Sequence, residues 1–242
     1  MTELLVITCT YRKPRRLNYL NECVKTFRQV AFMRWIVVED DHGIDPAVKG
    51  LLEASGITHV YLHIYSRSYG NAQKNLALTY IRDHDLKGIV YVADDDNVYD
   101  IRLFEEIRKT RKISVFPVGN LGPNGIERPI LKGGKIVGWD ADWRSRKYPV
   151  DQGGYAINAQ LLHTLKDPIW DHQSYGGESE FIDKLIRSPE ELEILCDDCR
   201  KCYMWHNYLL LPWPFRYPIS KAKVMATKAL RKMGVTFPGE RI

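Results

Sequence analysis

Three consecutive aspartates, Asp94, Asp95 and Asp96, follow a short apolar run in this chain of 242 residues. Neighbouring carboxylates repel one another, so they need water, a cation or hydrogen-bond donors close by. Mg²⁺ and Mn²⁺ prefer oxygen ligands and commonly keep substrate phosphates in their coordination shell. The aspartates therefore predict a divalent metal site that holds a diphosphate. A solvated acidic turn is the alternative, which the preceding apolar run GIVYVA disfavours.

Polar and aromatic residues also follow two other apolar runs near the N-terminus. Tyr11 comes after the run at 4–8, and Asp40 comes after the run at 35–38. An aromatic ring can stack on a nucleobase, and a carboxylate can accept a hydrogen bond from its N–H group. The pair therefore suits a nucleoside, although a packing residue and a helix cap remain the alternatives.

Two expected helix starts carry charged residues. Gly70 opens a helical pattern that contains Lys74, and Glu178 follows a Gly-Gly turn at the start of another helix. A helix N-terminus with a lysine suits a phosphate or a ribose. A carboxylate at such a turn can act as a general base. The alternatives are a solvated lysine and an acid that compensates the charge of the helix N-terminus.

The elements that position these residues alternate along the first 120 residues. Apolar runs predict strands at Leu4–Thr8, Trp35–Val38, His59–Ile64, Gly88–Val92 and Ile113–Val118. Helical spacing predicts helices at Arg15–Gln29, Pro46–Ala54, Asn71–Asp83 and Ile101–Arg108, the last capped by Asp100. This alternation predicts an α/β fold with a mainly parallel central sheet flanked by helices. Ligands in such sheets lie beyond the carboxyl ends of the strands, so the polar residues that follow the strands should converge.

The pattern changes near residue 120. The segment Gly119–Gly134 is rich in Gly, Pro and Asn and predicts loops or hairpin turns. Beyond it we expect a strand at 134–139, a helix at Glu178–Ile186 and a strand at 202–205. The second half also contains the aromatic and basic stretch WRSRKYPVDQGGYAIN.

Composition excludes several classes of protein. Thirty-five Lys+Arg against 30 Asp+Glu give a net charge of +5, which is too weak to argue for nucleic acid. No apolar run is long enough to span a membrane, and the N-terminus lacks a signal-peptide pattern, so a natural start at Met1 predicts a cytoplasmic protein. Five cysteines favour reduced thiols. Zinc held by Cys196, Cys199, Cys202 and His206 is disfavoured because a second CxxC pair is absent.

The C-terminal segment has a separate character. Residues 220–233 predict a helix with one apolar face and several lysines and arginines elsewhere, preceded by Trp213, Phe215 and Tyr217. Such a helix suits the surface of an anionic bilayer. A helix packed on the domain and a homodimer contact are equally compatible with the pattern.

These segments resemble glycosyltransferase family 43, the inverting β-1,3-glucuronyltransferases, which are nucleotide-sugar enzymes with a GT-A fold. The matching pieces occur in family order over about residues 3–207 and are ITCTYRKP, RWIVVEDD, GNAQKNLAL, GIVYVADDDNVYDIRLFEEIRKTRKISVFPVG, KIVGW, PVDQGGYAIN, GGESEF and WH. The resemblance implies a single GT-A domain of two fused halves. Residues 1–120 would bind UDP and metal, residues 121–208 would bind acceptor and carry the base, and residues 209–242 would form the tail.

The resemblance implies a role for each matching donor residue. Tyr11 resembles the tyrosine that stacks on uracil, and Asp40 resembles the carboxylate that hydrogen-bonds it. Asp94 and Asp95 resemble carboxylates on the nucleoside side, with Asp95 on the ribose. Lys74 stands at the second arginine of the family motif R-G-x-x-Q-R-N.

The remaining matches concern the metal, the base and the sugars. Asp96 resembles the direct Mn²⁺ ligand, and Glu178 resembles the catalytic base. Arg146 and Asp151 match contacts to the acceptor and donor sugars. His206 resembles the histidine that contacts the diphosphate.

The chain differs from the family at three positions where the family has an arginine. Tyr69 replaces the first arginine of that motif, Lys74 replaces the second, and the family's W-H-T-R becomes WHNY here. The carboxylate of UDP-glucuronic acid needs a cation, which Arg67 could supply, whereas UDP-xylose has no carboxylate. Glucuronate and xylose are therefore the expected sugars.

Together these features predict a metal-dependent, inverting glycosyltransferase that uses Mn²⁺ or Mg²⁺. It would move a sugar from UDP to a saccharide hydroxyl, and a lipid-linked glycan at the inner face of the membrane in polysaccharide biosynthesis would suit the basic tail. The alternatives are a nucleotidyltransferase of sugar phosphates and a non-catalytic sugar-nucleotide or glycan-binding module.

Overall fold

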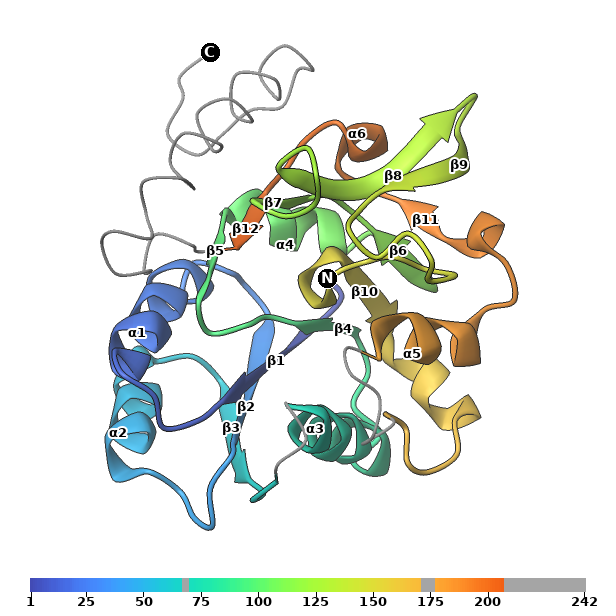
Figure 1. Ribbon diagram of the computed structural model, residues 1–242. Coiled ribbons are helices and arrows are strands. Elements are labelled where there is room, and N and C mark those ends of the chain that lie inside the picture. The colour runs from blue at the N-terminus through green and yellow to red at the C-terminus, as the bar shows by residue number, and fades with distance from the viewer. Residues whose placement is uncertain (67–69, 171–176, 207–242) are drawn as a thin grey trace.

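The computed structural model describes residues 1–66, 70–170 and 177–206 of the chain (Figure 1). A seven-stranded sheet forms its centre, in the order β11-β6-β10-β4-β1-β2-β3. Its strands are β1 (Leu4–Thr10), β2 (Met33–Glu39), β3 (His59–His63), β4 (Ile89–Val92), β6 (Ile113–Val115), β10 (Tyr155–Asn158) and β11 (Glu193–Ile194). Only β10 runs antiparallel to its neighbours β4 and β6. The predicted mainly parallel sheet is therefore confirmed.

Within the described residues, all helices except the last lie close to their predicted bounds. The helices are α1 (Arg16–Phe27), α2 (Pro46–Ser55), α3 (Asn71–Asp83), α4 (Ile101–Ile107), α5 (Glu178–Leu185) and the short turn α6 (Cys196–Cys199). Short 3₁₀ turns occur at Gln152–Gly154, Ala159–Thr164 and Pro189–Glu191. The Asp100 side chain accepts a hydrogen bond from the Arg102 N–H, which confirms the predicted cap of α4.

Helices cover both faces of the central sheet, because successive residues of a strand point to opposite faces. Leu4 and Val6 of β1 share one core with residues of α1, α2 and α4. Leu5 and Ile7 share the other core with residues of α3 and α5. In Figure 1, α1 and α2 lie to one side of β1–β3, and α3 lies to the other. The carboxyl ends of β1, β2 and β4 remain open to ligands.

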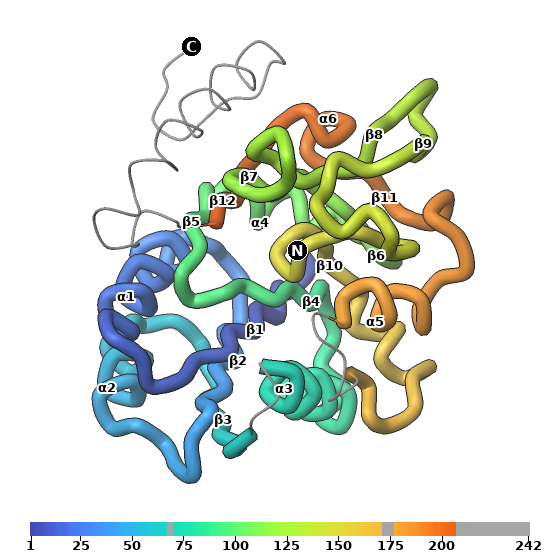
Figure 2. Tube along the Cα trace, viewed as in Figure 1, coloured from blue at the N-terminus to red at the C-terminus, as the bar shows by residue number. Residues whose placement is uncertain are grey.

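A second sheet has the order β5-β12-β7-β8-β9. Its strands are β5 (Asn97–Tyr99), β7 (Val118–Gly119), β8 (Ile126–Lys132), β9 (Lys135–Asp140) and β12 (Met204–His206). Figure 2 shows β12, near the end of the described chain, beside β5 from its first half, and the two strands pair antiparallel. This pairing brings His206 opposite Asn97, next to the three aspartates.

The structure corrects three expectations about strands. The predicted strand Ile113–Val118 is divided between β6 and β7, which belong to different sheets on either side of Phe116-Pro117. The segment Gly119–Gly134 contains the predicted hairpin turn, at Gly133-Gly134 with φ of +58° and +76°, but it also contains strand β8, which pairs with β9. The segment YAIN forms the buried strand β10, where no strand was expected.

Other expectations remain predictions. Segments from both sides of residue 120 contribute to both sheets, and the division at that residue stays a prediction. The tail at 209–242, the helix expected at 220–233, Arg67 and Tyr69 lie outside the described residues. Within the described part, none of the helices has the length and apolar character needed to cross a membrane.

Candidate active site

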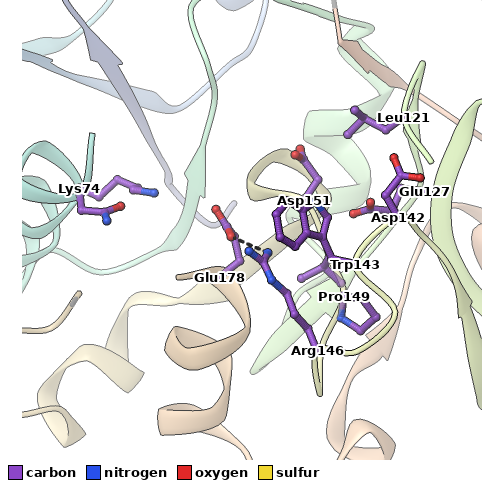
Figure 3. A pocket seen from close by; sticks show the side chains of 11 residues that line it. Lys74, Leu121, Glu127, Asp142, Trp143, Arg146, Pro149, Asp151 and Glu178 are labelled. Atoms are coloured by element: carbon purple, nitrogen blue, oxygen red, sulfur yellow. Dashed lines mark hydrogen bonds and ion pairs between the residues drawn. The ribbon is translucent and has the colours of Figure 1, made fainter. Parts of the chain in front are cut away.

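Two cavities contain most of the predicted site residues. The strand-end cavity has a volume of about 610 Å³ and is lined by Cys9, Thr10, Tyr11, Lys13, Asp40, Ser66, Gly70, Gln73, Asp94, Asp95 and Asp96. The Glu178 cavity has a volume of about 370 Å³ and is lined by Asn71, Lys74, Leu121, Glu127, Asp142, Trp143, Arg146, Pro149, Val150, Asp151 and Glu178 (Figure 3). Nine of the ten predicted site residues line one of them, and His206 lies beside Asp151.

The three aspartates differ in their surroundings. The Asp95 carboxylate is 3% exposed and accepts hydrogen bonds from Thr10 Oγ1 at 2.9 Å and Lys13 Nζ at 2.7 Å. Burial raises its pKa, although the charge of Lys13 opposes this effect. The side chain of Asp96 is 47% exposed and lies 3.4 Å from Lys13 Nζ. Asp95 is therefore fixed by its own protein partners, whereas Asp96 faces the cavity opening.

Asp94 connects the two cavities electrostatically. Its Oδ2 accepts a hydrogen bond from Asn97 Nδ2 at 3.2 Å. Burial and then the charge of Asp151 raise its pKa to about 7, while His206 acts in the opposite direction. The Nε2 atom of His206 lies 3.1 Å from Asp151 Oδ1. Burial alone would lower the pKa of His206, but this hydrogen bond and the nearby carboxylates raise it overall.

Glu178 is the first residue of α5 and is 8% exposed. The preceding Gly177 has φ of +71°, a left-handed conformation that glycine adopts without steric cost, so the chain can turn sharply into the helix. Glu178 Oε2 accepts a hydrogen bond from Arg146 Nη1 at 3.2 Å (Figure 3). Burial raises the pKa of Glu178, Asp151 adds to this effect, and Lys74 and Arg146 oppose it.

Lys74 lines the Glu178 cavity, whereas the sequence predicts it at a helix start as a donor-binding residue. Its side chain is 7% exposed, and Nζ donates to Gln152 Oε1 at 3.1 Å. The same atom lies 4.0 Å from the centroid of the Trp170 ring, at cation–π distance. The ammonium group is therefore held between a side-chain amide and an indole.

Tyr11 and Asp40 lie together in the strand-end cavity, as the sequence predicts for a nucleoside pair. Tyr11 is 53% exposed, and Lys13 Nζ lies 5.0 Å from its ring centroid. Asp40 Oδ1 accepts a hydrogen bond from the Ser66 N–H at 2.8 Å. An exposed ring and an oriented carboxylate are thus presented to the same cavity.

Glu127 and Trp143 also line the Glu178 cavity, although neither is a predicted site residue. Glu127 is 7% exposed, and burial followed by the charge of Asp151 raises its pKa to about 8. The Trp143 ring lies 4.6 Å from the Arg146 guanidinium and is 52% exposed. The aromatic and basic stretch around Trp143 was a usable signal, whereas the burial of Glu127 depends on tertiary packing alone.

The cysteines near the end of the described chain pack into the protein interior. Cys199 Sγ donates to the Val115 carbonyl at 3.8 Å, and Cys202 Sγ donates to the Met204 carbonyl at 3.1 Å. His206, the fourth member of the zinc hypothesis, contacts Asp151. Within residues 1–66, 70–170 and 177–206, no three His, Cys, Asp or Glu side chains are grouped to hold a metal ion by themselves.

Comparison with known proteins decides the family. The sequence model of glycosyltransferase family 43 matches residues 23–209. The chain belongs to glycosyltransferase family 43. It is 36% identical over 221 residues to the galactosylgalactosylxylosylprotein 3-beta-glucuronosyltransferase 2 of Mus musculus, which covers 84% of this chain and 68% of the relative. The corresponding enzyme P of Drosophila melanogaster is 33% identical, over 84% of this chain and 45% of the relative.

Solved structures show that this family 43 chain has the GT-A fold. S. aureus TarS 1–349 superposes with a TM-score of 0.57 at 13% identity, covering 96% of this chain and 65% of TarS. The mannosyltransferase PcManGT of Pyrobaculum calidifontis, solved with GDP-Man and Mn²⁺, has a TM-score of 0.56 at 16% identity, covering 95% and 64%. TarS has also been solved with UDP-GlcNAc.

The fold alone does not separate transfer of a sugar from transfer of a nucleotide. An inositol-1-phosphate CTP transferase from T. maritima has a TM-score of 0.59 at 9% identity, covering 92% of this chain and 97% of that protein. The family match and the glucuronosyltransferase relatives make the distinction, because they rest on sequence. The family 43 protein is therefore an enzyme, a glycosyltransferase.

Proposed function

We propose that this enzyme transfers a sugar from a UDP-sugar to a saccharide hydroxyl with inversion, with Glu178 as general base. The observation that carries the proposal is the position of the Glu178 carboxylate. It is buried at the first turn of α5 in a cavity that neighbours the three aspartates. His206 links the two cavities, because its Nε2 lies 3.1 Å from Asp151 Oδ1 and its strand pairs it with Asn97, which donates to Asp94 Oδ2 at 3.2 Å.

The strand-end cavity is the proposed donor site. The ring of Tyr11 is available to stack on uracil, and Asp40 is oriented to accept its N–H. Asp95, fixed by Thr10 and Lys13, has further lone pairs that could accept from ribose hydroxyls. The relatives are glucuronosyltransferases, which supports a sugar nucleotide as the donor.

Asp96 is the proposed ligand of a divalent cation. Its half-exposed carboxylate at the rim of the strand-end cavity fits Mg²⁺ or Mn²⁺, which bind through one or two protein carboxylates and complete their shell with phosphates and water. A bound cation would supply positive charge to the diphosphate as it departs. His206, whose pKa is raised, would add a hydrogen bond or a second positive charge on the same side.

The proton moves to Glu178 in the proposed reaction. Its carboxylate takes the proton of the acceptor hydroxyl as that oxygen attacks the anomeric carbon, while the bond from that carbon to the diphosphate oxygen breaks on the opposite side. Burial gives Glu178 a higher pKa and makes it a better proton acceptor. The hydrogen bond from Arg146 fixes the carboxylate and helps to keep it ionised.

Glucuronate is the favoured sugar. Lys74 is buried in the Glu178 cavity, where the transferred sugar must lie between the diphosphate and the base. Its ammonium group would compensate a sugar carboxylate. Lys74 would thereby take the role that the sequence suggested for Arg67. Xylose, which has no carboxylate, remains the second candidate donor sugar.

The acceptor is proposed to be a glycan with a free hydroxyl. The relatives are named for a galactosylgalactosylxylosylprotein acceptor, which makes galactose-terminated saccharides the first class to test. A lipid-linked glycan, a peripheral position at the cytoplasmic face of the membrane and a homodimer rest on residues 220–233, which lie outside the described part.

A thermal-shift experiment tests the donor proposal. UDP-glucuronic acid, UDP-xylose and UDP-glucose are each added with and without Mn²⁺. A ligand at about 100 times its Kd should raise the melting temperature by roughly 5–10 °C, because it binds only the folded state. We expect the largest shift with UDP-glucuronic acid in Mn²⁺. Equal melting temperatures with every UDP-sugar and with buffer would contradict the proposal.

A further inference from the structure

Gln73 is a buried amide without a hydrogen-bond partner in the wall of the strand-end cavity. Its side chain is 1% exposed, and neither Nε2 nor Oε1 has a partner among the described residues. Buried amides are nearly always paired, because each unpaired group costs about 1–3 kcal/mol. The free protein therefore keeps an unsatisfied donor and an unsatisfied acceptor beside a cavity of ligand size.

The packing of α3 does not require an amide at position 73. Gln73 is the third residue of α3, and Ala77 and Ile81, four and eight residues later on the same helical face, pack in the apolar core. An apolar side chain at position 73 would continue this stripe. Gly70, which precedes the helix with φ of +84°, brings the helix start close to Cys9 at the end of β1, at the cavity wall.

The neighbouring polar groups in this cavity already have partners. Asp95 accepts from Thr10 and Lys13, and Asp40 accepts from the Ser66 N–H. These carboxylates offer only acceptor atoms when ionised. The carboxamide of Gln73 differs from them because it presents an N–H donor and an oxygen acceptor side by side.

We propose that Gln73 is a specificity-determining residue, whose carboxamide binds an adjacent donor and acceptor on a uridine nucleotide. Two parts of that ligand have this chemistry: the imide edge of uracil, where an N–H lies between two carbonyls, and the vicinal hydroxyls of ribose. The inference rests on the proposed function, in which the strand-end cavity holds the UDP part of the donor.

Gln152 supplies a matched control. It is also buried, at 7% exposure, but both of its amide atoms are paired, with Lys74 Nζ at 3.1 Å and with Tyr155 OH at 3.0 Å. The same substitution at the two positions should therefore have opposite effects on the ligand-free protein. Gln73→Met keeps an unbranched side chain and removes two unpaired polar atoms, so the melting temperature should rise. Gln152→Met leaves two partners unpaired, so the melting temperature should fall.

Isothermal titration with UDP and Mn²⁺ measures the binding role. We expect Gln73→Met to weaken UDP about 5- to 150-fold, the change that corresponds to an unpaired amide. Gln73→Glu, which keeps an acceptor and removes the N–H donor, should also weaken UDP. The wild-type protein should prefer UDP to both CDP and 2′-deoxy-UDP. If Gln73→Met no longer prefers UDP to CDP, the amide contacts the base. If it no longer prefers UDP to 2′-deoxy-UDP, the amide contacts the ribose.

The outcomes separate this inference from the proposed function. A wild-type protein that ignores UDP in Mn²⁺ would overturn both. A wild-type protein that binds UDP, with Gln73→Met binding equally well, would overturn only the role of Gln73. A lower melting temperature for Gln73→Met would also overturn it, since the amide would then stabilise the free protein.

Discussion

The guanidinium of Arg146 donates a hydrogen bond to the carboxylate of Glu178 at 3.2 Å, from a loop before the 3₁₀ turn at 152–154 to the first turn of α5. Burial raises the pKa of Glu178, and Arg146 and Lys74 lower it. The ion pair therefore holds the carboxylate in place and counters part of its desolvation.

Replacing Arg146 should change the pH dependence of the reaction. In Arg146→Met the pKa of Glu178 loses a lowering influence, so the carboxylate ionises only at higher pH. Because the proposed base must be ionised, the acid limb of kcat/KM should move to higher pH. Arg146→Lys keeps the charge and should move it less. An acid limb at the same pH in all three proteins would show that Glu178 is not the group that titrates.

Asp96→Ala should remove the dependence of UDP binding on the metal. The half-exposed carboxylate forms a long ion pair with Lys13 Nζ at 3.4 Å, so its loss should leave the fold intact. Asp83→Ala, which removes an exposed carboxylate at the far end of α3, is the control. Titrations of UDP with and without Mn²⁺ measure the effect. A Mn²⁺ enhancement that survives in Asp96→Ala would move the cation to another ligand.

The contribution of Glu127 to the stability of the free protein should be lost as the pH rises from about 4.5 to about 8. Burial raises the pKa of Glu127 from 4.5 to about 8, so the folded state binds this proton more tightly than the unfolded state does. Stability from this group is therefore present at low pH and is lost as the pH rises toward 8.

Melting curves between about pH 5 and pH 8 check this expectation, because the two pKa values of Glu127 bound this range. The side chain in Glu127→Gln cannot titrate, so its melting temperature should decrease less over this pH range than that of the wild-type protein. The difference should be a few degrees, because 1 kcal/mol of unfolding free energy corresponds to about 2–4 °C. Glu105→Gln changes an exposed acid on α4 and should behave like the wild type. If the melting temperature changes with pH equally in all three proteins, Glu127 is ionised in the folded state over the whole pH range.

Gly119→Ala should disturb the strand that carries His206. A Cβ on Gly119 would lie 2.1 Å from Trp205 Cδ1, and Trp205 is the β12 residue that pairs with Gly119. Overpacking of this kind costs about 1–3 kcal/mol. Gly138→Ala in β9, where the nearest atom is 3.9 Å away, should have little effect. Denaturant unfolding compares the two variants, and equal stability would show that Trp205 moves aside freely.

Local signals explain why much of the fold was predictable. The cap at Asp100, the proline-led start of α2 and the periodicity of α3 are properties of short segments, and these three helices appear at their predicted places. The aspartates follow β4 directly, so the rule that ligands lie beyond the carboxyl ends of strands was sufficient to bring them together with Tyr11 and Asp40.

Other features depend on partners far away in the chain. Strand β10 is fixed by antiparallel pairing with β4 and β6. Its four residues are too few to show a periodicity from which this pairing could be predicted. Lys74 sits on a helix that was predicted correctly, yet its ammonium group is directed by Gln152 and Trp170. Burial of Glu127 and Gln73 likewise becomes visible only after the chain has folded.

Release of UDP from UDP-glucuronic acid, in the presence of Mn²⁺ and a panel of galactose-terminated saccharides, tests the proposed base most directly. Wild-type protein should release UDP only when an acceptor is present. Glu178→Gln keeps the shape of the side chain and removes the proton acceptor, so turnover should fall by about 10²–10⁴-fold while UDP binding stays nearly unchanged. Turnover of Glu178→Gln within a few-fold of the wild type would contradict the assignment of the base.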